Sequence, residues 1–269
     1  YKLSAFHSIF NICNVCILIW AVKLIERTVC ALIHPKEEDE EPRLRFITGG
    51  MLSTAELSIL QARKEINLFA ERIRRMFRMV TDLLHTDDET AFNKLFSRIE
   101  KYENISDNME VEIANYLNQV SEGRLSSESK LQIRGMLREV TEIESIGDSC
   151  YNLARTINRK RRGSEDFTQG QYEHIHEMFH LTDEALKQMI ALVEDVHHSE
   201  DVNKSFNIET EINNYRNRLK NQNVIDVNDK KYDYQMGVHY MDLITECEKL
   251  GDYVVNVVEA HCDVKEKKA

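Results

Sequence analysis

The sequence predicts an all-α protein, in which one N-terminal transmembrane helix is followed by a six-helix bundle made of two tandem three-helix repeats. Three observations support this prediction. The 269 residues include only 9 glycines and 2 prolines, and these are the residue types that mark hairpins and long loops in sheet proteins. Apolar residues recur every three or four positions along six long stretches, which is the period of a helix face. A twelve-residue segment also returns in a similar form 104 positions later.

The composition excludes some classes of protein. With 42% hydrophobic and 30% charged residues, the chain lies in the globular range. Its net charge of −11 is opposite in sign to the basic surface of a nucleic-acid binder, so nucleic acid is not an expected partner. The six cysteines lack the dense spacing of a disulfide scaffold, which favours a reducing, cytosolic setting for the soluble part.

Residues 1–34 are predicted to contain the membrane helix. Between Lys2 and Lys23 lie twenty uncharged residues, which as a helix are about 30 Å long, the thickness of a bilayer core. Lipid offers polar side chains no hydrogen bonds, so a polar stripe on such a helix favours packing against other membrane helices. A lone anchor with tolerated polar residues is the alternative. The stripe consists of Ser4, His7, Ser8, Asn11 and Asn14.

Residues 35–50 are predicted to be a linker on the cytoplasmic side. This segment contains both prolines of the chain, Pro35 and Pro42. Basic residues are concentrated at the end of the membrane helix and in the linker, and such residues favour the cytoplasmic side of a membrane. We therefore expect everything after about residue 34 to be cytoplasmic.

The first repeat is predicted to span residues 51–163. Its first helix covers about 54–85 and begins at a capping-box pattern. Its second keeps helical spacing over 92–120. The third is capped by Ser126 or Ser127 and ends in a run of basic residues, which suits the C-terminus of a helix.

The second repeat is predicted to span residues 164–269. It contains three further amphipathic stretches, at 168–197, 200–221 and 229–262. The last of them corresponds to the third helix of the first repeat. An internal duplication of a three-helix unit is the simplest account of this pattern.

Two segments fix the register of the duplication. Residues 141–152 align with residues 245–256 and are identical at six of the twelve positions. A second correspondence, with an offset of 106, sets Glu103, Asp107 and Asn108 beside Glu209, Asn213 and Asn214.

Paired carboxylates are the main candidates for chemistry. Acidic residues four apart are no more frequent in this chain than random placement gives, but Glu144 and Glu248 take the place of an apolar residue in the same helix stripe of both repeats. A carboxylate turned toward a helix interface has to be paired, protonated or bound to a metal. The pairs with helical spacing are Glu144 and Asp148, Glu248 and Asp252, and Glu103 and Asp107.

Two glycines lie inside these same helices. Gly147 and Gly251 each cost a helix up to about 1 kcal/mol relative to alanine, so we expect a neighbouring helix or ligand to approach closely there.

Sites made only of carboxylates suit hard cations such as Mg²⁺, Ca²⁺ and Mn²⁺, and iron also accepts oxygen ligands. We therefore expect a divalent cation or iron at the acidic pairs. Internal ion pairs are the alternative, with arginines such as Arg134, Arg138 and Arg155 as partners. Both interpretations predict that the acidic face is buried.

The histidines and the remaining motifs point to no enzyme. An ExxH pattern ends at His176, His180 and His197, but di-iron carboxylate bundles need this motif on two different helices. We expect these histidines on a solvated face. The phosphate-binding, dinucleotide-binding and nucleophile motifs that mark common enzymes do not occur in the sequence.

Two motifs resemble a known pairing of domains. Residues 6–11, FHSIFN, resemble the start of the last transmembrane helix of bacterial Na⁺/phosphate cotransporters. The two ExE-x-[IL]-G-D segments resemble the third helix of each repeat in the PhoU-like domain that follows the membrane domain of those proteins. The resemblance covers nearly the whole chain.

The resemblance implies a cytoplasmic regulatory PhoU-like domain of a sodium-dependent phosphate transporter in the inner membrane. Sodium and inorganic phosphate would bind the membrane domain upstream of this sequence, and a homodimer is left open. The family's cation motifs carry over to Glu103, Asp107, Glu144, Asp148, Glu209, Glu248 and Asp252. Asn213 stands where the family has a carboxylate, which weakens the second site. The alternative function is a membrane-tethered helical interaction module whose acidic pairs form structural ion pairs without metal.

Overall fold

The computed structural model divides into a part that ends at Glu41 and a part that begins at Pro42. The bundle belongs to the second part. The residues that the structure describes are 6–7, 10–11, 44–47, 54–163, 165–194 and 202–266, with side chains to Cys262.

Most of the predicted membrane segment, 1–34, lies outside the described residues, and so do Ser4, Ser8 and Asn14 of its polar stripe. The two described stripe residues are helical, and the amide nitrogen of Asn11 lies 3.2 Å from Nε2 of His7. In the described ranges, no helix combines the length and the apolar character that crossing a bilayer demands.

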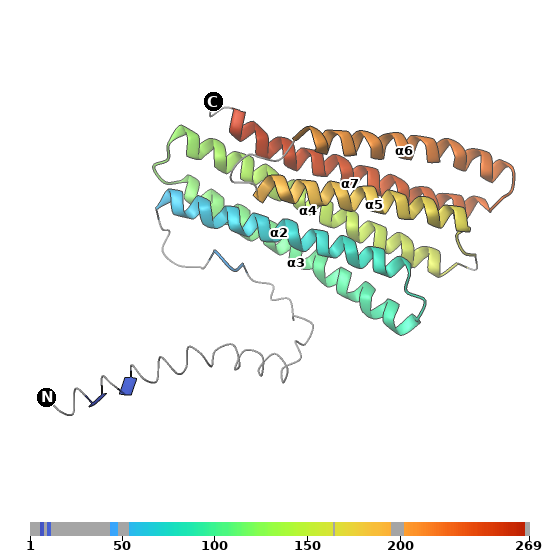
Figure 1. Ribbon diagram of the computed structural model, residues 1–269, viewed down its shortest axis with the longest axis horizontal. Helices are drawn as coiled ribbons and strands as arrows, with labels where there is room; N and C mark the ends of the chain where they lie inside the picture. Colours follow the sequence, from blue (N-terminus) through green and yellow to red (C-terminus); the bar gives the residue numbers. More distant parts are fainter. Residues whose placement is uncertain are drawn as a thin grey trace. The chain divides into compact units, whose positions relative to one another are not determined.

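Six long helices run side by side (Figure 1), as the hydrophobic spacing predicts, and the described residues contain no strand. The predicted boundaries are close to the observed ones in α2 to α5, whereas α7 begins five residues and ends four residues later than the predicted 229–262, and α6 continues seven residues beyond the predicted 221. Its last turns carry Val224 and Ile225 exposed, so no buried stripe marks them in the sequence. The helices are α2 (Ala55–Leu84), α3 (Glu89–Ser121), α4 (Ser127–Arg161), α5 (Gln169–Glu194), α6 (Val202–Asn228) and α7 (Tyr234–Glu266).

Side chains cap the starts of α3, α4, α5 and α7; the hydroxyl of Thr168 accepts the backbone N–H of Gln171 at 3.2 Å, and Asp233 accepts that of Met236 at 2.6 Å. Asp88 caps α3 by accepting a hydrogen bond from the backbone N–H of Ala91 at 2.8 Å. Ser126 is the cap of α4, and its hydroxyl accepts the backbone N–H of Ser129 at 3.0 Å. The N-cap of α2 is Thr54, whose side chain makes no capping bond. The predicted capping box pairs Ser53 with Glu56, and Ser53 lies outside the described residues.

The bundle consists of two three-helix units that meet through four helices. Helices α2, α3 and α4 pack on one another, and so do α5, α6 and α7. The units join where α4 packs along α7 and α2 packs on α5. Helices α3 and α6 contact only helices of their own unit, so each lies at an outer edge of the bundle.

One carboxylate inside this interface is fully buried. Glu139 of α4 accepts two hydrogen bonds from the guanidinium of Arg63 on α2, one of them at 3.0 Å. It also lies 3.2 Å from Nδ1 of His261 on α7. Burial by itself would raise the pKa of Glu139, but Arg63 and His261 hold it below its usual value. The ionised carboxylate thus joins three helices from both repeats.

The end of the predicted linker is attached to the bundle. Glu65 of α2 is fully buried, and its carboxylate accepts the backbone N–H groups of Arg45 at 3.1 Å and Phe46 at 2.7 Å. Leu44 and Ile47 pack against the hydrophobic core on either side of these bonds. The segment 44–47 is therefore attached to α2 at a defined position.

Candidate metal centre

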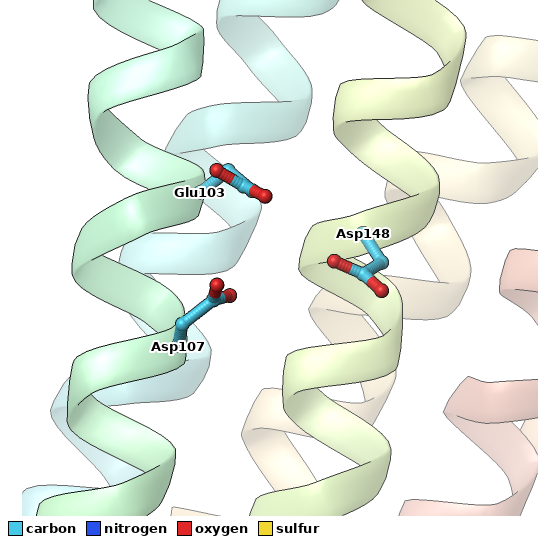
Figure 2. A group of neighbouring side chains, drawn as sticks. All are labelled: Glu103, Asp107 and Asp148. Atoms are coloured by element: carbon cyan, nitrogen blue, oxygen red, sulfur yellow. The ribbon is translucent and has the colours of Figure 1, made fainter.

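Three carboxylates converge between α3 and α4. Glu103 and Asp107 project from α3 toward α4, and Asp148 projects back from α4 (Figure 2). One oxygen from each carboxylate lies within 4.8 Å of the other two. Hard cations hold oxygen ligands at about 2.0–2.6 Å, so oxygens up to about 5 Å apart can share one ion. The three residues therefore fit a single hard divalent cation.

The backbone brings these side chains together because the two helices approach closely beside them. A Cβ atom added to Gly147 would lie 2.9 Å from Oγ of Ser106 and 3.0 Å from Cδ1 of Ile73. Ser106 immediately precedes Asp107, and Gly147 immediately precedes Asp148. The predicted role of Gly147 is thus confirmed, since its missing side chain leaves the space that α3 occupies.

Glu144 adds a fourth carboxylate with an unusual proton affinity. Its pKa is raised to about 7, first by partial burial and then by the negative charges of Asp148, Glu110 and Asp107. One turn further along α4, Asp148 also has a raised pKa, through burial and the charge of Asp107. The region therefore concentrates more negative charge than the protein itself neutralises.

Little positive charge lies nearby to offset this cluster. Burial and the charges of Asp107 and Asp148 raise the pKa of Glu103, while Lys249 acts on Asp148 in the opposite direction. Within the described ranges, no lysine or arginine forms an ion pair with Glu103, Asp107, Glu144 or Asp148.

In the second repeat the corresponding residues are arranged differently. Glu248 of α7 forms an ion pair with Arg216 of α6 and is only 15% exposed. Asn213 donates a hydrogen bond to Glu209 one turn earlier on α6. The pKa of Asp252 is raised by burial and by the charges of Glu248 and Glu209, and Arg216 opposes this shift. The protein thus supplies its own cation at this position.

This difference arises at two pairs of equivalent positions, one of which is Asn213 in place of Asp107. With the offset of 106 that relates Glu103 to Glu209, Arg216 corresponds to Glu110. Sequence reasoning missed both residues, although the register of the duplication contains the signal. The arginine partners that it named instead lie elsewhere: Arg138 pairs with Glu259 at 3.3 Å, and Arg155 lies over the ring of Tyr151.

The prediction that the acidic face is buried is only partly correct. Glu103, Glu144, Glu209 and Glu248 are half-buried, whereas Asp107, Asp148 and Asp252 are exposed. The carboxylates lie at the rim where an outer helix meets α4 or α7, because the outer helices have neighbours on one side only. Fully buried glutamates do occur, but they are Glu65 and Glu139.

Of the ExxH histidines, His176 and His180 are exposed, as predicted, and His197 lies outside the described residues. His176 is nevertheless in contact with another repeat, since its Nε2 lies 2.9 Å from Nε2 of His85 at the end of α2. Its partner is an imidazole rather than the carboxylate that a di-iron site would require.

Comparison with known proteins identifies the family. The model of the PhoU domain matches residues 66–157 and 175–260, one match in each repeat. Two solved structures share the fold. The phosphate transport system regulatory protein PhoU from Streptococcus pneumoniae has 13% identity and a TM-score of 0.67, over 79% of this chain and 97% of its own.

PhoU from Pseudomonas aeruginosa has 12% identity and a TM-score of 0.71, over 79% of this chain and 99% of its own. No curated protein matches the sequence. Both halves of the bundle match the family model, and together the matched residues cover more than half of the chain. The chain therefore belongs to the PhoU family and carries two PhoU domains in tandem.

Proposed function

We propose that this chain is the cytoplasmic regulatory part of a sodium-dependent phosphate transporter, and that its bundle binds a hard divalent cation or iron between α3 and α4. The family membership supports the regulatory role, because a solved relative with this fold is a regulatory protein of a phosphate transport system. The uncharged run between Lys2 and Lys23 supports a membrane context. In this proposal sodium and phosphate bind membrane segments upstream.

The observation that carries the cation site is the group formed by Glu103, Asp107 and Asp148, joined by the half-buried Glu144. A bound dication would offset the mutual repulsion that, after burial, raises the pKa of Glu103, Glu144 and Asp148. In the second repeat, the guanidinium of Arg216 already provides positive charge beside Glu248. We therefore assign the site to the first repeat, with Glu209, Glu248 and Asp252 as its ion-paired counterpart.

Equivalent substitutions in the two repeats test the cation site. Calorimetric titration of the full chain with Mn²⁺ should show binding, and Asp148→Asn should abolish that binding. Asp252→Asn, at the equivalent position of the second repeat, should leave that binding unchanged. Equal affinities for wild type and Asp148→Asn would refute the site, and an equal loss in both variants would refute its assignment to the first repeat.

The transporter role has its own test. The whole protein, with the membrane segments that the proposal places upstream, is reconstituted in vesicles and supplied with labelled phosphate and a sodium gradient. Sodium-dependent uptake is the expected result, and Asp148→Asn should change its rate. Vesicles that take up no phosphate in a sodium gradient would overturn the transporter assignment, whatever the result of the Mn²⁺ titration.

A metal-free interaction module is the second candidate. The ion pair between Arg216 and Glu248 favours it, because it shows that one of the two acidic regions is neutralised within the protein. This candidate predicts that no divalent cation binds the full chain in the Mn²⁺ titration.

A further inference from the structure

A pair of histidines joins the two repeats at a place remote in sequence from the acidic cluster. His85 is the C-cap residue of α2, and His176 lies on α5. Their Nε2 atoms are 2.9 Å apart, and their ring centroids are 4.6 Å apart with the planes tilted by 47°. Each imidazole thus directs its own Nε2 atom toward a common point.

Two arrangements give such a separation. In the first, one neutral imidazole donates its Nε2–H to the lone pair of the other. In the second, both lone pairs bind one metal ion. With metal–nitrogen bonds of about 2.0–2.1 Å and bond angles near 90–110°, the two nitrogens are about 2.9–3.4 Å apart. The observed separation therefore already matches that of two ligands on one ion.

Metal binding needs a neutral imidazole. Partial burial and the neighbouring His176 lower the pKa of His85, against a smaller opposite effect of Asp82 and Asp87. His85 is therefore disposed to be neutral near pH 7, with its lone pair available.

A cavity of about 520 Å³ lies beside the pair and is bordered by both histidines and also by Asp82, His180 and Asp183. Asp183 is engaged, because Arg74 donates two hydrogen bonds to it at 2.9 and 2.8 Å. Among the described residues, no third histidine, cysteine or carboxylate brings a ligand atom within 4.8 Å of both imidazole nitrogens. The two imidazoles are therefore the ligands that the protein presents here, and the cavity leaves room for water in the other positions.

We propose that His85 and His176 form a second metal site, selective for divalent metals that prefer imidazole, such as Zn²⁺, Ni²⁺ or Co²⁺, with water in the remaining coordination positions. Imidazole suits these metals, whereas Mg²⁺ and Ca²⁺ prefer oxygen. A metal bound there links the C-terminal end of α2 to α5 and so fastens one PhoU repeat to the other. This site is independent of the function proposed above.

The test uses Co²⁺ as the probe, added to the full chain in the presence of excess Mg²⁺ to occupy the carboxylates. Cobalt is chosen because its absorption distinguishes nitrogen and oxygen ligands from the thiolates that Cys13 and Cys16 offer. We expect one equivalent with nitrogen ligation and a rise in the melting temperature. His85→Ala or His176→Ala should weaken binding by more than the roughly 10- to 100-fold loss seen when only an outer-shell partner is removed.

Two controls make the result decisive. His239→Ala removes a histidine of α7 that lies outside this cavity and should leave Co²⁺ binding unchanged. Asp148→Asn, in the acidic cluster, should also leave it unchanged. If an alanine variant melts at a lower temperature without metal, His85→Asn and His176→Asn replace it in the comparison. Co²⁺ binding that is equal in wild type and in both histidine variants would overturn the proposal.

Discussion

Asn152 of α4 donates a hydrogen bond to Glu246 of α7 at 3.2 Å, and the same bond recurs with the helices exchanged, from Asn256 of α7 to Glu142 of α4 at 2.9 Å. Each residue of the first bond lies 104 positions from its counterpart in the second. The two repeats therefore meet about an approximate twofold axis. This contact explains why both repeats carry the same asparagine and the same glutamate, without any bound cation.

The reciprocal bonds predict a charge-dependent effect on stability. Asn256→Asp replaces the donor amide by a carboxylate that faces Glu142. We expect the free energy of unfolding at pH 7 to fall by about 1–3 kcal/mol, since a part-buried acceptor loses its donor and gains a like charge. Chemical denaturation measures this value. The loss should diminish at pH 4, where carboxylates become protonated, and a loss that is constant with pH would contradict the explanation.

Arg216 provides a way to change the number of cation sites. The double substitution Asn213→Asp and Arg216→Glu gives the second repeat the acidic pattern of the first. We expect the variant to be less stable without cation, because Glu248 loses its partner, and to bind a second equivalent of Mn²⁺ with recovery of stability. Calorimetry gives the stoichiometry. A variant that still binds one equivalent would show that further features of the first repeat are required.

The acidic cluster predicts how stability depends on pH without cation. The folded pKa of Glu144 is about 7, above the ordinary glutamate value of 4.5, so between these two values the folded state retains a proton that the unfolded state has lost. The contribution of Glu144 is therefore most favourable below about pH 4.5 and is lost as the pH rises toward 7. Because the side chain is partly exposed, the effect is on the order of 1 kcal/mol after screening.

Glu144→Gln should remove that part of the pH dependence and stabilise the cation-free protein at pH 8. Thermal melting in the presence of a chelator measures it. Glu112→Gln, at an exposed position of α3, is the matched control and should leave the profile unchanged. A profile that Glu144→Gln does not alter would show that Glu144 titrates normally.

The two helix glycines should respond differently to alanine. At Gly147 the new Cβ would meet Oγ of Ser106 at 2.9 Å, whereas at Gly251 the nearest atom is Cδ1 of Ile212 at 3.3 Å. Alanine favours a helix by up to about 1 kcal/mol over glycine, so Gly251→Ala should be neutral or stabilising. Gly147→Ala should be destabilising, because the nearby hydroxyl belongs to a short, buried side chain.

Ser106→Ala should partly rescue Gly147→Ala by removing the clashing hydroxyl. Oγ of Ser106 has no hydrogen-bond partner among the residues that the structure describes, so its loss costs little by itself. Urea unfolding of the two single variants and the double variant gives the coupling energy. Additive effects would show that the clash is relieved elsewhere.

The hydrogen bonds to Glu65 predict how accessible the end of the linker is to a protease. Glu65→Ala removes the acceptor for the N–H groups of Arg45 and Phe46, so trypsin should cleave after Arg45 faster than in the wild type. Glu71→Ala, on the exposed face of the same helix, should leave the rate unchanged. Limited proteolysis followed by mass spectrometry of the fragments measures both rates.

The fold was largely predictable because it depends on local patterns. The period of apolar residues predicts all six helices, the serines before α4 offer Ser126 or Ser127 as its cap, and the repeated segment 141–152 gives the register of the repeats. The partners of charged side chains were not predictable, since they depend on how each helix is rotated against its neighbours. Arg216 and Glu248 lie on different helices, and no spacing in the sequence relates them.

Single residues outside periodic segments were also missed. His85 follows the last turn of α2, where no stripe directs attention to it. Burial of Glu144 was overestimated because its apolar stripe follows the rim between α3 and α4 rather than the centre of the bundle. The stripe shows which helix face is in contact but not how deeply it is covered.

The attachment of residues 44–47 to α2 determines how tension in the chain would reach the bundle. Glu65 holds this segment by two backbone N–H groups, which every residue except proline possesses. The attachment therefore tolerates most substitutions at positions 45 and 46. Proline at either position would remove the N–H group that Glu65 accepts there. A pull on the chain at Leu44 acts on the Glu65 carboxylate and on the apolar contacts of Leu44 and Ile47, and it passes into α2, which contacts both its own repeat and α5.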